Sequence, residues 1–213
     1  MAATPMVAGI TIMTIDTTVT DTGTVMADRL IVGGSGASGT PIAVELLRQL
    51  REHHSGIETH LVVSRGAELT LRQECGMDVE ELRALAGVFH KNDEIGASIA
   101  SGSFQIMGMV IVPCSMKTVA GIASGYSDNL LLRAADVCLK ERRKLVLCAR
   151  EAPLSTIHLR NLYELGRMGA VILPPVLTYY QRPESVEDMT RHIVGKLLDQ
   201  FGLDCPGFRR WEG

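Results

Sequence analysis

The sequence predicts an α/β protein with a doubly wound, mostly parallel sheet in a single domain. Short apolar runs alternate along the chain with segments of helical periodicity. The apolar runs are continuous, as in strands buried on both faces, rather than apolar at every second residue. A glycine-rich turn at residues 34–39 joins the first apolar run to the first helical segment. Together these observations favour a Rossmann-like or flavodoxin-like fold.

The expected elements alternate from the first strand to the last helix. The first strand covers 30–32 and leads through the glycine-rich turn into a helix that starts near Thr40. Helical signals extend over 67–85, and a polar loop covers 91–105, a length at which loops often carry function. The other expected strands are 57–64, 107–112, 144–149 and 170–173, and the other helices end at 123 or cover 128–143, 155–168 and 184–201.

The composition excludes several classes of protein. A net charge of −3 and an aromatic content of 4% argue against a nucleic-acid partner. The five cysteines are odd in number and form no C-x-x-C motif, which favours reduced thiols in a cytoplasmic protein over disulfides or a zinc site. The six histidines lack metal-ligand spacing, so we expect solvated or incidental histidines and no metal. No apolar run reaches the ~20 residues that span a membrane.

The first 28 residues contain neither Lys nor Arg and many threonines. A secretory signal begins with basic residues and a mitochondrial presequence is rich in Arg, so neither interpretation fits. Two remain: a disordered leader, or a mis-assigned start, with Met26 as a normal first residue directly before the first strand. The expected folded domain then covers 29–213.

The turn at 34–39, Gly-Ser-Gly-Ala-Ser-Gly, fits the pattern G-x-G-x-x-G between a strand and a helix. Free N–H groups at the start of the helix predict a cradle for a phosphate, and a plain tight connection is the alternative. The second strand ends in Ser64-Arg65, where an NAD-binding fold usually has an acidic residue. This argues against NAD and leaves FMN, or NADP with Arg65 at the 2′-phosphate.

In a parallel sheet the carboxyl ends of the strands meet at one edge, where ligands bind. The segments 33–39 and 113–118, with Ser64 and Arg150-Glu151, are therefore expected on one rim. Their hydroxyl groups suit a phosphate and a ribityl chain, and Arg150 adds a fixed positive charge. The rim hydroxyls belong to Ser38, Ser64, Ser115 and Thr118.

Charged residues near this rim suggest a second anion site. Lys117, Lys140 and Arg150 are candidates to hold the anion, and Glu151 is a candidate general acid or base. The alternatives are a structural ion pair between Arg150 and Glu151 and a solvated helix end at Lys140.

Six motifs follow one another along the chain. They are Gly-Ala-Ser-Gly at 36–39, Ala-Ser-Gly-Ser at 100–103, Pro-Cys-Ser-Met-Lys-Thr at 113–118, the basic segment 133–143, Arg-Glu-Ala-Pro at 150–153 and Tyr-Gln-Arg-Pro at 180–183. With these motifs in this order, the chain resembles the UbiX-type flavin prenyltransferases from about Arg29 to Trp211. Proline at 41 is typical of relatives paired with phenolic-acid decarboxylases, whereas ubiquinone-pathway members often have an aromatic residue after this turn.

The resemblance implies a homo-oligomer, a dodecamer in this family, that works without metal. It implies that the enzyme joins a dimethylallyl group from dimethylallyl monophosphate to N5 and C6 of reduced FMN. The product, prenylated FMN, passes to a UbiD-type decarboxylase.

The resemblance also implies roles for individual residues. Lys196 replaces an Arg that many members carry, which keeps the charge and loses the bidentate fork. The implied FMN contacts are Gly36, Ala37, Ser38, Ser64, Ser115, Met116, Lys117, Thr118 and Arg150. The implied catalytic residues are Ser38, Glu74, Lys140 and Glu151, and the implied contacts to the prenyl phosphate are Arg133, Lys140, Tyr180, Lys196 and Trp211.

Two other functions are open at this stage. One is an FMN-dependent cysteine decarboxylase of related fold, but those proteins carry a Pro-Ala-Met-Asn motif where this chain has Pro-Cys-Ser-Met at 113–116. The other is an FMN carrier without catalytic activity. A carrier has no need of Lys140, Glu151 and Tyr180.

Overall fold

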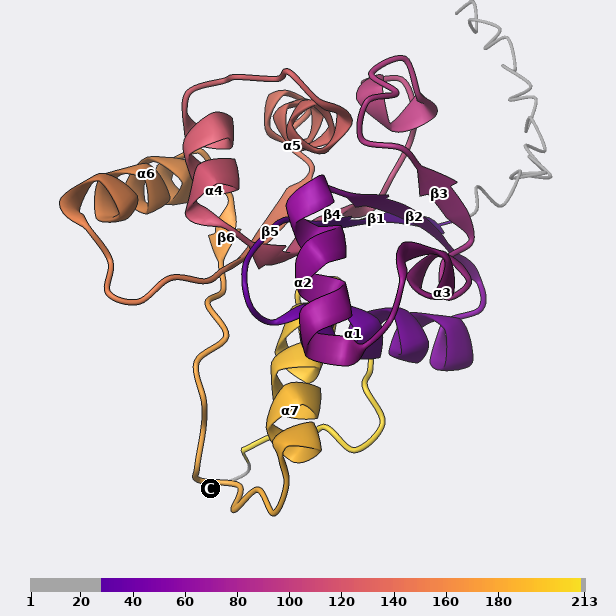
Figure 1. Cartoon of the computed structure of the whole chain (residues 1–213), viewed down its shortest axis with the longest axis vertical. Helices are drawn as coiled ribbons and strands as arrows, with labels where there is room; N and C mark the ends of the chain where they lie inside the picture. Colours follow the sequence, from indigo (N-terminus) through magenta and orange to yellow (C-terminus); the bar gives the residue numbers. More distant parts are fainter. Residues whose placement is uncertain (1–27, 212–213) are drawn as a thin grey trace, which may run out of the picture.

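The computed structural model describes residues 28–211, and they form one six-stranded sheet in which every strand is parallel to its neighbours (Figure 1). The strand order is β3-β2-β1-β4-β5-β6. The order reverses between β1 and β4, and in such sheets a ligand crevice opens at the carboxyl ends of these two strands. The strands are β1 Asp28–Gly34, β2 Ile57–Val63, β3 Val88–His90, β4 Gly108–Cys114, β5 Lys144–Ala149 and β6 Val171–Ile172.

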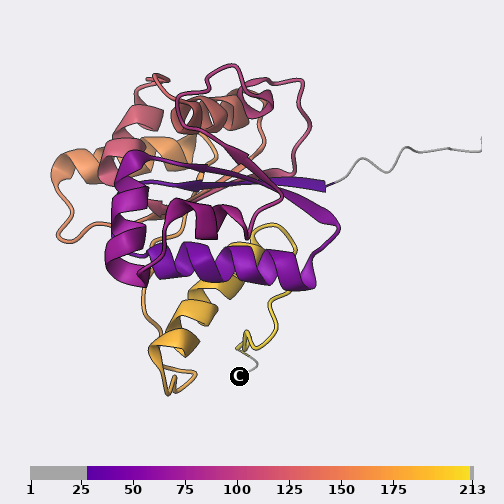
Figure 2. The same ribbon diagram turned by 45° about the vertical axis from the view of Figure 1, so that its right-hand side comes forward.

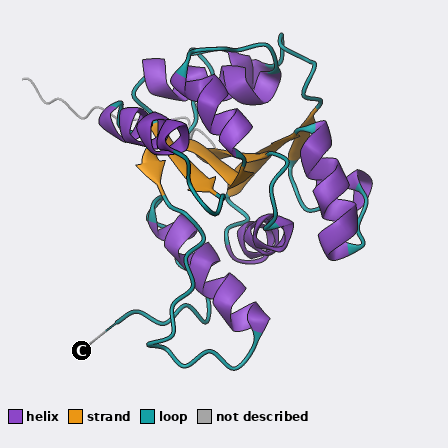
Figure 3. Ribbon diagram, turned by 60° about the vertical axis from the view of Figure 1, so that its left-hand side comes forward, coloured by secondary structure: helices purple, strands orange, loops and turns teal. Residues whose placement is uncertain are grey.

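Helices cover both faces of the sheet (Figures 2 and 3). On one side lie α1, α2, α3 and α7, and on the other lie α4, α5 and α6. None of the helices within residues 28–211 is long and apolar enough to cross a membrane. The helices are α1 Thr40–His53, α2 Arg65–Cys75, α3 Val79–Arg83, the 3₁₀ turn η1 Ser98–Ala100, α4 Met116–Ala123, α5 Leu130–Lys140, α6 Thr156–Arg167 and α7 Val186–Asp199.

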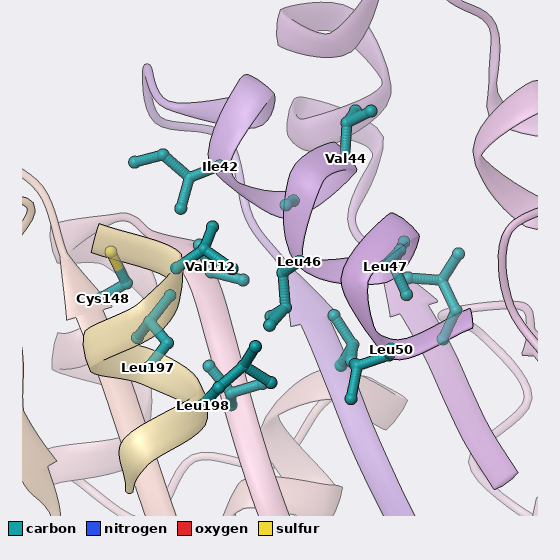
Figure 4. Packing of buried hydrophobic residues seen from close by; sticks show 14 of the residues in the cluster. Ile42, Val44, Leu46, Leu47, Leu50, Val112, Cys148, Leu197 and Leu198 are labelled. Atoms are coloured by element: carbon teal, nitrogen blue, oxygen red, sulfur yellow. The ribbon is translucent and has the colours of Figure 1, made fainter. Parts of the chain in front are cut away.

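The two helix layers enclose two apolar clusters, one on each face of the sheet. Along β1, Leu30 and Val32 belong to one cluster and Ile31 to the other, and all three are at most 1% exposed. Figure 4 shows Leu46 of α1 and Leu197 and Leu198 of α7 together over the strands. Burying each such side chain contributes about 1.5–3 kcal/mol, which explains why the central parts of the strands are continuous apolar runs.

The fold confirms the prediction of a single α/β domain with a parallel sheet, and it corrects several element boundaries. The short strand β3 was not predicted. The helical signal over 67–85 divides into α2 and α3, because Gly76 ends α2 with a φ of 65° and Asp78 starts α3 with a capping box. The helix expected at 128–143 ends at Lys140. The predicted leader covers residues 1–28. Asp28 already belongs to β1, and residues 1–27 lie outside the described residues.

The C-terminal part of the chain leaves the sheet and returns to it. After β6 an extended segment, 173–185, leads away from the sheet, and α7 runs back toward it (Figure 1). The end of α7 reaches the amino edge of the sheet, where the Nζ of Lys144 donates a hydrogen bond to the carbonyl oxygen of Gln200. The segment 205–211 then packs along α7, with Phe208 against Gly195.

Candidate active site

The glycine-rich turn follows β1 at the carboxyl edge of the sheet. Two of its three glycines, Gly36 and Gly39, are needed for different structural reasons. Gly34 is the last residue of β1. Gly36 packs on Gly66, so that a Cβ atom at Gly36 would lie 2.9 Å from the Cα of Gly66. Gly39 has a φ of 115° and is the N-cap of α1. Within the turn, Gly39 alone therefore needs glycine for its backbone conformation.

The start of α1 is held by a carboxylate. Oε2 of Glu74, in the last turn of α2, accepts hydrogen bonds from the backbone N–H groups of Gly39 and Thr40, both at 2.9 Å, and from the Thr40 hydroxyl at 2.7 Å. The expectation that these N–H groups are free for a phosphate is wrong, because Glu74 already supplies their negative charge. Partial burial raises the pKa of Glu74, but hydrogen bonds from Ser38, Thr40 and Gly39 outweigh it and hold the pKa below its ordinary value.

A second helix start at this edge has free donors. Ser115 is the N-cap of α4, and its hydroxyl lies 3.2 Å from both the Ser35 and the Thr118 hydroxyl oxygens. The Ser35 hydroxyl oxygen also accepts a hydrogen bond from the Ser115 backbone N–H at 2.8 Å. Within residues 28–211, the backbone N–H groups of Met116 and Lys117 have no hydrogen-bond partner. Three linked hydroxyls and a free helix N-terminus make this the better anion cradle.

Two further predicted residues border the glycine turn. Ser64 is the N-cap of α2, and its hydroxyl accepts a hydrogen bond from the Ala67 N–H at 3.2 Å. Its own N–H donates to the Gly34 carbonyl at 2.9 Å. Gly36 and Ser38 are exposed and Ala37 is half-buried. The Met116 side chain is buried in the core, so only its backbone faces the edge of the sheet.

Arg150 and Glu151 follow β5 and lie beside the end of β4, because the Arg150 N–H donates to the Cys114 carbonyl at 3.0 Å. Both side chains are exposed. Oε1 of Glu151 accepts a hydrogen bond from the Ala152 N–H at 3.0 Å. In the described part of the chain no ion pair joins Arg150 to Glu151, so the alternative of a structural ion pair is wrong and both charges face outward.

Lys140 does not share this rim, which corrects the sequence expectation. α5 runs antiparallel to the strands, and only residues 141–143 separate Lys140 from the start of β5 at the amino edge. β5 has six residues, so roughly 17–20 Å separate the two edges. Lys140 forms an ion pair with Glu141 instead. Arg133, on the same helix, donates to the Ala100 carbonyl at 3.2 Å and pairs with Asp136 at 2.6 Å.

Three other predicted residues form a separate group around α7, to which only Lys196 belongs. The rings of Tyr180 and Trp211 meet edge to face, with centroids 5.4 Å apart. Tyr180 also packs against His192, and Lys196 lies one turn further along the helix. Within residues 28–211, no hydrogen bond or ion pair links this group to the glycine turn or to α5. In one protomer the predicted residues therefore lie in three places: at the carboxyl edge, on α5, and on or beside α7.

Sequence reasoning missed three buried histidines. Nδ1 of His60 lies 2.9 Å from Nε2 of His90, and the two rings stack at 12°. His192 is 8% exposed. The expectation of solvated or incidental histidines is wrong for these three. A signal was present, since His60 lies inside an apolar strand run and His192 lies on the buried side of the last helix.

Known proteins resemble this chain over most of its length. A protein-family model described as Flavoprotein matches residues 20–198. A probable UbiX-like flavin prenyltransferase from Streptomyces sp. (strain D7) is 55% identical over 185 residues, which cover 87% of this chain and 92% of the relative. The chain belongs to the UbiX-like flavin prenyltransferases. It is accordingly a transferase that attaches a prenyl group to a flavin.

Two solved structures of similar proteins agree with this family. One is AnUbiX (PadA1) in complex with FMN and dimethylallyl pyrophosphate, whose sequence is 48% identical. The two superpose with a TM-score of 0.86 over 88% of this chain and 99% of the AnUbiX chain. The other is a dodecameric FMN-dependent UbiX-like decarboxylase from Escherichia coli O157:H7, which is 51% identical and has a TM-score of 0.85. The match covers 87% of this chain and 100% of the E. coli chain. The cysteine decarboxylase SpaF shares only the fold, at 20% identity and a TM-score of 0.57.

Proposed function

We propose that this flavin prenyltransferase joins a dimethylallyl group from dimethylallyl monophosphate to N5 and C6 of reduced FMN. The C–O bond of the donor breaks, phosphate leaves, and prenylated FMN is released for a UbiD-type decarboxylase. The observation that carries this proposal is the similarity to AnUbiX, whose structure holds FMN and dimethylallyl pyrophosphate. When bound, reduced FMN supplies the two nucleophilic atoms.

The carboxyl edge of the sheet fits FMN. We assign the flavin phosphate to the start of α4, where the hydroxyls of Ser115 and Thr118 and the N–H groups of Met116 and Lys117 converge. A phosphate at the start of α1 is disfavoured, because the Glu74 carboxylate lies there. The rest of the flavin would then run along the exposed side of the turn. The remaining proposed contacts are Gly36, Ala37, Ser38, Ser64 and Arg150.

The donor needs cations where its phosphate leaves, since negative charge grows on that oxygen as the C–O bond breaks. We propose that Arg133, Lys140 and Lys196 supply this charge and that the Tyr180 hydroxyl supplies a hydrogen bond. Trp211 would cover the prenyl group. Lys196 provides charge without the bidentate geometry of an arginine, so we expect it to bind the phosphate more weakly than an arginine would.

The proposed residues meet only if several copies of the chain assemble. Lys140 lies at the amino edge, and Tyr180 of the extended segment and Trp211 of the tail lie beside α7, whereas Ser38 and Glu151 lie at the carboxyl edge. A homo-oligomer can complete one site with residues of neighbouring protomers. The relative from E. coli O157:H7 is dodecameric, and we propose the same assembly here.

Two carboxylates differ in their proposed roles. Glu151 is exposed and accepts one hydrogen bond from a neighbouring N–H, which leaves it free to move protons during ring closure. Glu74 is held by several donors and keeps a fixed charge, so we assign it to orienting Ser38 near the reacting flavin atom. No step in this scheme calls for a metal. All five cysteines are free, which fits a reducing compartment such as the cytoplasm.

The test is a single anaerobic reaction. The purified protein is mixed with reduced FMN and dimethylallyl monophosphate, and the flavin is analysed by mass spectrometry. We expect a flavin heavier by one five-carbon prenyl group and an equal amount of free phosphate. Tight binding of FMN without any change in its mass would overturn the proposal and favour an FMN carrier. Loss of carbon dioxide from a cysteine-ending peptide would favour a decarboxylase.

A further inference from the structure

The buried ring of His192 contacts two aromatic side chains. It contacts Phe208 with centroids 5.2 Å apart and meets the Tyr180 ring edge to face at 5.8 Å. Tyr180 in turn packs on Trp211. His192 also forms part of the wall of a cavity of about 390 Å³ between the start of α7, the segment 178–184 and the tail.

A chain of hydrogen bonds fixes the tautomer of His192. Nε2 of Gln181 donates to the Arg209 carbonyl, which turns Oε1 of the same amide toward His192. Nδ1 of His192 lies 3.2 Å from this oxygen. An amide oxygen only accepts, so Nδ1 carries the hydrogen. In the neutral ring Nε2 is then bare, and the Tyr180 hydroxyl, 3.4 Å away, donates to it.

We propose that His192 is a positioning residue that sets the direction of the Tyr180 hydroxyl and thereby couples binding of the prenyl phosphate to uptake of a proton. The inference rests on the proposed function, which assigns Tyr180 to the phosphate of the donor. With His192 neutral, the Tyr180 hydrogen points at Nε2 and only oxygen lone pairs face a ligand. With His192 protonated, Nε2–H donates to the Tyr180 oxygen, and the Tyr180 hydrogen is free to bind a phosphate oxygen.

The charges around His192 favour a neutral ring without ligand and a protonated ring with it. Burial lowers the pKa of His192, and the positive charge of Lys196 lowers it further. A phosphate bound by Lys196 offsets that charge. The other charged groups beside the cavity come from every element around it: Arg182 and Glu184 from the extended segment, Asp188 and Arg191 from α7, and Arg209 from the tail.

The experiment measures proton uptake on binding by calorimetry, in two buffers of different ionisation enthalpy between pH 6 and 8. The ligand is dimethylallyl monophosphate, added to the protein loaded with oxidised FMN, which does not react. His192→Phe keeps an aromatic ring between Phe208 and Tyr180 and removes the titrating nitrogens. Tyr180→Phe keeps His192 and removes the hydroxyl that it directs.

We expect the wild type to take up a fraction of a proton beyond that of the phosphate itself, and to bind up to about tenfold more weakly for each pH unit above the pKa of His192. Both variants should lose the extra uptake and this pH dependence, and the double variant should resemble either single one. His192→Phe should keep its affinity for FMN. Should it fail to fold, His192→Gln, which does not titrate, gives the same comparison.

The outcomes separate this inference from the proposed function. If His192→Phe takes up as many protons as the wild type, the inference is wrong, even where the wild type turns over. If the wild type shows the extra uptake and both variants lack it, the inference stands, even where no prenylated flavin forms. Absence of any binding of dimethylallyl monophosphate to the FMN-loaded wild type overturns both.

Discussion

The hydroxyl of Thr40 lies 2.7 Å from Oε2 of Glu74, and this bond ties the first turn of α1 to the last turn of α2. The same oxygen accepts the N–H groups of Thr40 and Gly39. The N-cap itself, Gly39, has no side chain to offer. A carboxylate distant in sequence thus caps the helix after the glycine turn and fixes one wall of the proposed flavin site.

Glu74→Ala should lower the free energy of unfolding by about 1–2 kcal/mol, because three donors at the start of α1 lose their acceptor. Urea denaturation at pH 7 measures the loss, and the neighbouring exposed residue offers a control, Gln73→Ala, which should change stability by less than about 0.5 kcal/mol.

The contribution of Glu74 to stability should also depend on pH. Since folding lowers the pKa of Glu74, this contribution is complete above the unfolded pKa of 4.5 and disappears as the pH falls through the folded pKa. Equal stability of the two variants would show that water replaces the carboxylate.

Thr118→Val tests the phosphate cradle at the start of α4. Valine has nearly the same shape but no hydroxyl, so we expect FMN to bind about tenfold more weakly, equivalent to about 1.4 kcal/mol. The affinity for riboflavin, which lacks the phosphate, should not change. Quenching of flavin fluorescence gives both affinities.

Ser124→Ala, at the other end of α4, is the matched control for Thr118→Val, and it should leave both affinities as they are. Its hydroxyl donates a hydrogen bond to the Gly121 carbonyl at 3.1 Å, within α4 and its C-cap. An equal loss of FMN and riboflavin affinity in Thr118→Val would mean that the hydroxyl maintains the fold and does not contact the phosphate.

Much of the fold could be predicted from the sequence because buried parallel strands have a strong local signature. The strand at 144–149 was predicted to the residue. The three-residue strand β3 could not be predicted, since its pairing with β2 rather than its composition defines it. Lys140 was placed on the wrong edge, because motif order says nothing about the direction in which a helix crosses the sheet. The contact between Glu74 and α1 joins residues 34 positions apart, so no local sequence pattern predicts it.

A test of subunit complementation follows from the position of Lys140. Lys140→Ala and Glu151→Gln should each reduce kcat, and the reduction should be at least tenfold. If a site takes Glu151 from one protomer and Lys140 from another, mixed oligomers of the two variants contain intact sites. With random mixing, about a quarter of the sites are intact, and the mixture should recover about that share of wild-type activity.

Ser38→Ala mixed with Glu151→Gln is the control for complementation. Ser38 and Glu151 both lie at the carboxyl edge, so every site in this mixture keeps one defect and activity should not recover. Recovery in the control but not in the Lys140 mixture would contradict the proposed assembly of the site.

The buried pair of His60 and His90 should make stability fall at mildly acidic pH. Burial lowers the pKa of both rings, and within residues 28–211 Nε2 of His60 has no hydrogen-bond partner, although Oε2 of Glu58 lies 3.3 Å away. Below the ordinary histidine value of 6.5 the unfolded chain binds protons that the folded chain does not, so the free energy of unfolding decreases from pH 6.5 toward pH 5. Each such histidine contributes a slope of at most about 1.4 kcal/mol per pH unit.

Two variants test this pH dependence. His60→Leu should make the slope shallower, whereas His53→Gln, at an exposed site, should not. Chemical denaturation at several pH values measures both, and an unchanged slope in His60→Leu would mean that the pair is already protonated in the folded protein.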